Sequence, residues 1–87
     1  MVTKRMKVIG SQGFHMRPAS VFAAAMGKFQ SEVTLRFKGQ PINAKSLMHL
    51  IAAGIPCGAE IDVVCDGPDE KEALAKATEL IESGFGE

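Results

Sequence analysis

The stretch VTLRFKGQPIN, residues 33–43, decides the fold because it holds two strands and the turn that joins them. Every second residue from Val33 to Phe37 is apolar, which predicts a strand with one buried face. Lys38-Gly39-Gln40 is a hairpin signal, and a short strand follows over Pro41–Asn43. Proline at its first position fits a strand start or a sheet edge. The hairpin makes the two strands antiparallel neighbours.

Two further segments show the same alternation. Val2–Val8 predicts the first strand of the chain, and Ala59–Cys65 predicts the last, with Val64 as the one break in its pattern. Strands with one apolar and one polar face indicate an antiparallel sheet that has helices on one side and water on the other. The acidic residues of the last strand then belong to its wet face and are not paired catalytic carboxylates: Glu60, Asp62 and Asp66.

Apolar residues at helical spacing predict the first helix. Phe22, Met26 and Phe29 recur at i, i+4 and i+7, which gives an amphipathic helix from about Met16 to Lys28. Pro18 lies in its first turn, where a missing N–H costs nothing because that donor has no helical partner.

Two other segments carry helix signals. Ser46 is the natural N-cap of a short helix that ends at Gly54, although Asn43 could compete as the cap. Residues 67–70, GPDE, open the last helix with acidic residues in its first turn, and Gly84 ends it. The apolar stripe of this last helix is formed by Leu74, Ala77 and Ile81.

The complete order is β-α-β-β-α-β-α, an α+β fold with a four-stranded antiparallel sheet and three helices on one face. We expect residues 1–87 to form a single domain. Ten basic residues balance ten acidic ones, so net charge favours neither nucleic acid nor a membrane surface as a partner. Any anion recognition must therefore be local.

Two composition features bear on the compartment. No apolar run approaches the length of a membrane span, and none follows the basic residues near the N-terminus, which argues against membrane insertion and against a secretory signal. Cys57 and Cys65 lack CxxC spacing and metal-partner histidines, so we expect no metal, no cofactor and a reducing cytoplasm. Cys65 lies on the apolar side of its strand and is interpreted as a small buried hydrophobe.

The run GSQGFHMRPAS, residues 10–20, holds the residue expected to carry the chemistry, His15. It lies between a glycine-rich turn and a helix start, where free backbone N–H groups and the helix dipole attract anions. Arg17 adds a forked donor suited to phosphate or carboxylate. This pattern predicts phosphoryl chemistry at His15, with the backbone N–H groups of Met16 and Arg17 holding phosphoryl oxygens.

Two motifs resemble those of a known family. Residues 13–20, GFHMRPAS, followed by Phe22, are similar to the active-site motif of HPr. HPr proteins are the histidine-containing phosphocarriers of the phosphoenolpyruvate-dependent sugar phosphotransferase system. Residues 43–48, NAKSLM, are similar to the family's regulatory serine segment. The resemblance covers essentially the whole chain. It implies an open-faced β-sandwich and a carrier rather than an enzyme with independent turnover.

The resemblance also implies roles for particular residues. His15 would accept a phosphoryl group from enzyme I on its pros nitrogen and pass it to EIIA domains of sugar permeases, with Arg17 stabilising the phosphate. Ser46 would be a regulatory phosphoserine made by an HPr kinase/phosphorylase, through which the protein acts with a catabolite-control transcription factor in carbon catabolite repression. The expected partner contacts of this cytoplasmic monomer are Met16, Ser20, Leu47, Met48 and Ile51.

Two positions depart from the family pattern. Met16 stands where alanine is usual, and His49 stands where a small residue is usual. Met16 is interpreted as adjusting partner docking, and His49 as a surface residue without a role. Three alternatives stay open: an enzyme using His15 as general base, a paralogue in a nitrogen-related or dihydroxyacetone-kinase phosphorelay, and a regulatory module in which only Ser46 acts. The chain offers no second catalytic motif, and the segment at 43–48 favours the sugar branch.

Overall fold

The chain folds into one antiparallel sheet with helices against one face of it. The structure, a computed structural model, describes residues 1–8 and 16–83 of the 87-residue chain. The strands are β1 (Val2–Lys7), β2 (Glu32–Phe37), β3 (Gln40–Asn43) and β4 (Glu60–Asp66), and the helices are α1 (Met16–Met26), α2 (Leu47–Ala53) and α3 (Glu70–Glu82). The sheet order is β1-β4-β2-β3, with every neighbouring pair antiparallel. The predicted order, fold class and sheet are confirmed.

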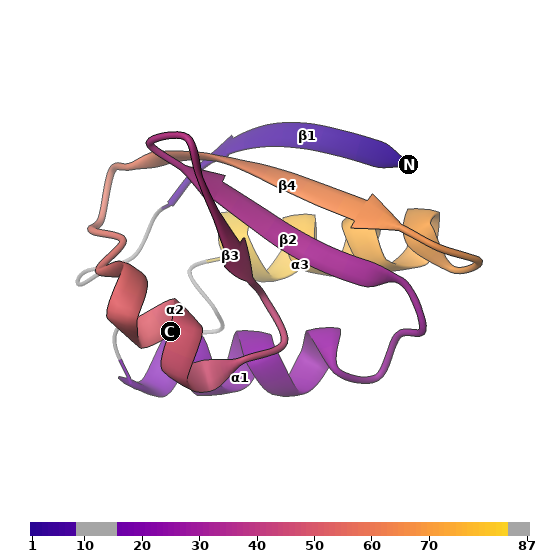
Figure 1. Ribbon diagram of the computed structural model, residues 1–87, viewed down its shortest axis with the longest axis horizontal. Helices are drawn as coiled ribbons and strands as arrows, with labels where there is room; N and C mark the ends of the chain where they lie inside the picture. The colour runs from indigo at the N-terminus through magenta and orange to yellow at the C-terminus, as the bar shows by residue number, and fades with distance from the viewer. Residues whose placement is uncertain (9–15, 84–87) are drawn as a thin grey trace.

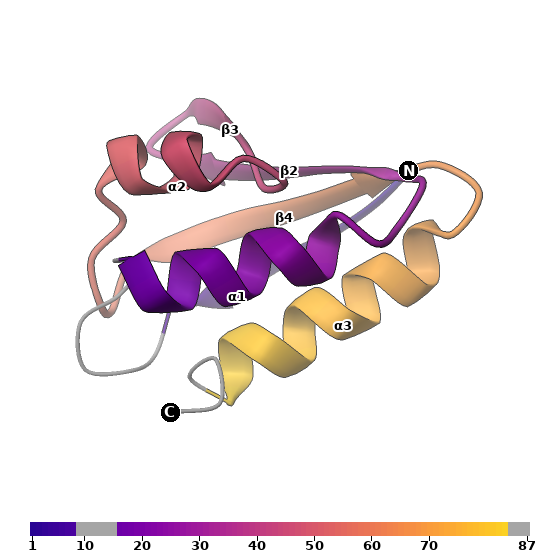
Figure 2. The same ribbon diagram turned by 90° about the horizontal axis from the view of Figure 1, so that it is seen from below.

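The helices cover one face of the sheet, and Figure 2 shows α1 and α3 side by side against it. The short α2 lies beside β3 and the first half of α1 (Figure 1). The core fills the space between these layers because the inward positions of each strand and helix are apolar. Its largest fully buried side chains include Phe22, Met26, Leu35, Leu50, Ile61 and Ile81. Cys65 is fully buried, as predicted, and desolvation raises the pKa of its thiol.

The opposite face of the sheet is open to water. On it, Arg5 from β1 donates to Asp62 from β4, with 3.0 Å between Nε and Oδ1. The Arg5 guanidinium lowers the pKa of the Asp62 carboxyl. Glu60 and Asp66, at the two ends of β4, are also exposed. The interpretation of these acidic residues as the wet face of the last strand is confirmed.

The β2–β3 hairpin turns on two residues with positive φ. Phe37 pairs with Gln40, while Lys38 and Gly39 between them have φ of 53° and 78°. Positive φ at both central residues defines the tight turn whose twist matches the flanking strands. The predicted hairpin is confirmed.

The free edge of β3 is closed by Pro41 and His49. Because Ala44 N donates to Val33 O, the register places the N–H of Asn43 on the side away from β2. Pro41, also on that side, has no N–H to offer. The Asn43 N–H instead donates to His49 Nδ1 at 3.0 Å. The interpretation of His49 as a residue without a role was therefore wrong, because its ring satisfies a strand-edge donor.

Two helices differ slightly from the prediction. α1 ends at Met26 and not at Lys28, because the chain then tightens into i→i−3 bonds from Lys28 N to Ala25 O and from Phe29 N to Met26 O. In α3 the buried stripe is Ala73, Ala77 and Ile81, while the predicted Leu74 is only half-buried. The predicted stop at Gly84 lies outside the described residues.

One hydrogen-bonded junction joins the end of α1 to the start of α3. The fully buried Ser31 donates through N and Oγ to Asp69 Oδ1, and Gln30 N donates to Asp69 Oδ2 at 2.9 Å. Asp69 N in turn donates to Ser31 Oγ at 3.2 Å. These hydrogen bonds lower the pKa of the Asp69 carboxyl, and the bond from the Ser31 hydroxyl has the largest effect. Asp69 precedes α3 but makes no side-chain capping bond to that helix. Its carboxylate instead accepts from the segment that follows α1.

Candidate functional site

The candidate site lies at the start of α1. His15, the predicted phosphoryl acceptor, lies outside the described residues and directly precedes Met16, the first residue of α1, in the sequence. The first backbone N–H groups of any helix lack helical acceptors and carry its positive dipole end. The main chain of α1 therefore begins where the sequence predicts an anion site.

One face of α1 is exposed next to that start. Arg17, Ser20, Val21 and Ala24 share the i, i+3, i+4, i+7 spacing, and all four are exposed. Arg17 is the second residue of the helix and carries the positive charge predicted to contact phosphate. Ser20 follows one turn later on the same face. The predicted Arg17 and Ser20 are thus both on the surface beside the helix start.

Apolar residues are also accessible on α2, which packs against α1 (Figure 1). Met48 is 76% exposed and Val21 is 41% exposed, while Leu47 and Ile51 are half-buried. The prediction that the short helix exposes at least one apolar residue is confirmed. We call the set Arg17, Ser20, Val21, Leu47, Met48 and Ile51 the α1–α2 surface. Val21 was missed by the sequence analysis, although its spacing from Arg17 was a usable signal.

Ser46 caps α2 as predicted. Its Oγ accepts from His49 N at 3.2 Å, and its backbone is extended at φ −106° and ψ 112°. Asn43 does not compete for the cap because its Oδ1 accepts from Lys45 N. The other end of α2 stops at Gly54 in the left-handed conformation, also as predicted.

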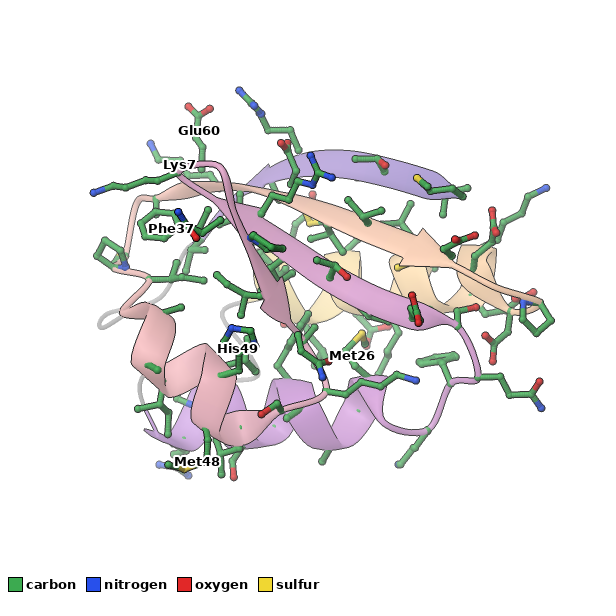
Figure 3. The ribbon with its side chains drawn as sticks, viewed as in Figure 1. Lys7, Met26, Phe37, Met48, His49 and Glu60 are labelled. Carbon is green, nitrogen blue, oxygen red and sulfur yellow. The ribbon has the colours of Figure 1, made fainter. Side chains whose placement is uncertain are left out.

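The described part of the chain also holds a cavity away from the α1–α2 surface. A cavity of about 600 Å³ lies between the β2–β3 hairpin and α2, lined by Phe37, Pro41, His49 and Pro56 among others. Figure 3 shows His49 and Met48 on different sides of α2, so this cavity is separate from the α1–α2 surface. Within residues 1–8 and 16–83, no cluster of His, Cys, Asp or Glu could hold a metal ion. No helix there is long and apolar enough to cross a membrane.

These features define a class of protein: a small open-faced β-sandwich with an exposed cation and an apolar patch at a helix start. The model of the family PTS-HPr, described as the PTS HPr component phosphorylation site, matches residues 2–83. The chain belongs to this HPr family.

Individual relatives support the assignment along the full length. The chain is 37% identical to the phosphocarrier protein HPr of Treponema pallidum (strain Nichols) over 87 residues, covering 100% of this chain and 99% of that protein. The crystal structure of HPr-C-His from Thermoanaerobacter tengcongensis is similar at a TM-score of 0.96 and 33% identity, covering 100% of this chain and 98% of that one.

A second kind of relative is also similar. The catabolite repression containing protein Crh of Bacillus subtilis, a domain-swapped dimer in its crystal, has a TM-score of 0.75 and 33% identity, with 97% of this chain and 92% of that chain covered. The family match and the full-length HPr relative together show that the chain is a phosphocarrier of the phosphotransferase system and not an enzyme with independent turnover.

Proposed function

We propose that His15 is the phosphoryl acceptor, that enzyme I is the donor and that EIIA domains of sugar permeases are the recipients. The observation that carries this proposal is the start of α1 at Met16, which puts the first-turn backbone N–H groups, whose acceptors cannot come from the helix itself, and exposed Arg17 directly after His15 in the chain. A phosphohistidine N–P bond is reactive because imidazole is a good leaving group, so the carrier has only to position and stabilise the group.

The α1–α2 surface is the proposed docking site for both partners. Its apolar residues lie on the packed helices α1 and α2, together with exposed Arg17 and Ser20, and an apolar centre with a polar rim is typical of protein interfaces. The predicted contacts Met16, Ser20, Leu47, Met48 and Ile51 belong to α1 and α2, whose packing brings two segments of the chain to one surface.

A mass measurement tests the carrier proposal. The protein is incubated with phosphoenolpyruvate and enzyme I, and its intact mass is read before and after acid treatment. One phosphoryl addition that acid removes is expected, because phosphohistidine is acid-labile and phosphoserine is not. No addition in the presence of enzyme I that is active on another HPr would contradict the assignment to the sugar branch.

Replacing Arg17 by alanine is expected to slow phosphoryl transfer from enzyme I by about tenfold without unfolding the protein. A charge-assisted hydrogen bond to a phosphoryl oxygen has about that effect on a rate. Transfer is measured by rapid-quench labelling. Lys28→Ala removes an exposed charge just beyond the other end of α1 and serves as the control. Equal rates for the two variants would show that Arg17 does not touch the phosphoryl group.

We further propose that Ser46 is phosphorylated by an HPr kinase/phosphorylase and that the modified protein acts with a catabolite-control transcription factor. The support is the N-cap position of Ser46, where added negative charge is favourable to the helix, and the similarity to a catabolite repression protein. The same charge would lie beside the apolar α1–α2 surface and would oppose docking of an acidic partner.

Ser46→Asp is expected to raise the KM for transfer from enzyme I about threefold to tenfold, because one added charge at a partly solvated interface costs roughly that factor. Ser46→Asn is the matched control, since asparagine caps a helix as well as aspartate but carries no charge. Steady-state transfer kinetics compare the two variants. The charge-repulsion account fails if Ser46→Asp and Ser46→Asn have the same KM.

We also propose that residues 1–87 act as a single domain, as a monomer and in the cytoplasm. β1 pairs with β4 across most of the sequence, and all strands share one core, which supports one cooperative unit. Both thiols are free, and Cys57 is exposed, which fits a reducing compartment. Sedimentation at micromolar concentration tests the monomer against the dimer described for the Bacillus subtilis relative.

A further inference from the structure

His49 joins the two ends of the turn that carries Ser46. Its ring Nδ1 accepts from Asn43 N at 3.0 Å, and its main-chain N donates to Ser46 Oγ at 3.2 Å. Figure 3 shows the His49 ring between α2 and β3. One residue therefore ties the start of α2 both to the edge of the sheet and to the serine hydroxyl.

The rest of the turn is fixed by Asn43 and Lys45. Asn43 Oδ1 accepts from Lys45 N at 3.0 Å, and Asn43 O accepts from Ser46 N at 3.1 Å. Lys45 Nζ donates to Phe29 O at 2.7 Å, which links the turn to the chain beyond α1. The bond from Asn43 N to the His49 ring joins the turn to an exposed side chain of α2.

The hydrogen bond from Asn43 N determines which nitrogen of the His49 ring is free of a proton. An Nδ1 that accepts a hydrogen bond has no proton, so a neutral imidazole here carries its proton on Nε2. The acceptor atom, Nδ1, is separated from Cβ by two covalent bonds. Asparagine can place an oxygen at the same distance from Cβ, while leucine places a methyl group there.

We propose that His49 is a positioning residue for the phosphorylation of Ser46, holding the turn in the one conformation that a serine kinase binds. This inference rests on the proposed regulatory role of Ser46. In the step itself, Ser46 Oγ attacks the γ-phosphorus of ATP and forms a new O–P bond. The bond from that phosphorus to the β–γ bridging oxygen breaks, ADP leaves, and the hydroxyl proton passes to a base of the kinase.

Loss of the ring acceptor should loosen the turn and leave the core unchanged. The His49 side chain is exposed, whereas the next residue, Leu50, is fully buried and anchors α2. When the competent conformation is only partly populated, the apparent affinity of a partner falls by that fraction, but turnover of the bound complex does not. The expected signature is therefore a change in KM for this protein at constant kcat.

The test compares wild type, His49→Leu and His49→Asn as substrates of a bacterial HPr kinase/phosphorylase with ATP. Acid-stable mass addition reports phosphorylation at Ser46. His49→Leu should raise KM about fivefold, the factor that one ordinary hydrogen bond is worth, with kcat retained. His49→Asn should stay within about twofold of wild type. Leucine is the better helix former, so a general effect of helix propensity would give the opposite order.

Amide hydrogen exchange at Asn43 provides a second measurement that needs no kinase. Exchange should accelerate about fivefold in His49→Leu and stay close to wild type in His49→Asn. Equal KM values for the two variants, or equal Asn43 exchange, would overturn the positioning role. If wild type itself gains no acid-stable phosphate, the regulatory role of Ser46 is wrong and the positioning role for it falls too. The exchange result then reports only whether the ring holds the turn.

Discussion

Replacing His15 by alanine is expected to abolish phosphoryl acceptance from enzyme I completely while the fold stays intact. The imidazole is the proposed nucleophile, and alanine offers no atom that can form the N–P bond. Intact mass after incubation with phosphoenolpyruvate and enzyme I should show no addition. Circular dichroism and the midpoint of thermal unfolding should match the wild type, because the described strands and helices already share one buried apolar core.

The second histidine provides the matched control for this experiment. The chain contains two histidines, and His49→Ala should accept one acid-labile phosphoryl group as the wild type does. Labelling that persists in His15→Ala and disappears in His49→Ala would move the acceptor to α2. Labelling that persists in both variants would show that the acceptor is not a histidine.

Replacing Gly67 by alanine is expected to lower the free energy of unfolding by about 2–4 kcal/mol, since overpacking and backbone strain act together. A Cβ at this position would lie 2.6 Å from both Cα and Oγ of Ser31. Ser31 cannot move away, because it is fully buried and bonded to Asp69. Gly67 also has φ of 155°, at the limit of what other residues adopt. Chemical denaturation measures the loss.

Gly39→Ala separates the contact from the backbone effect. Gly39 has φ of 78°, but a Cβ there would meet nothing within 4 Å, so the expected loss is only about 1 kcal/mol. An equal loss in the two variants would show that the close approach of the added Cβ to Ser31 contributes nothing to the loss in Gly67→Ala.

Most of the fold could be predicted because its signals are local. Alternating apolar residues in β2 and β4 and helical spacing in α1 reveal the buried face of each element before any partner is known. Turn and cap chemistry is equally local. Lys38-Gly39 forms the hairpin, and Ser46 and Gly54 bound α2.

The site was predictable to a lesser degree. The motif around His15 and the serine segment marked the chemistry, and the exposure of Arg17 and Met48 agrees with it. Val21 was not among the predicted surface residues, and His49 was interpreted as a surface residue without a role. Both errors concern contacts between elements, since Val21 matters only because α2 packs beside α1.

The sequence by itself determined the kind and order of the elements, their buried faces and the family of the protein, because periodicity and motifs are properties of neighbouring residues. Only the tertiary structure decided which partners the polar side chains bind through hydrogen bonds. Asp69 serves Ser31, 38 positions earlier, instead of capping α3, and His49 closes the edge of β3. Such choices depend on which segments packing brings together, and no local pattern encodes that geometry.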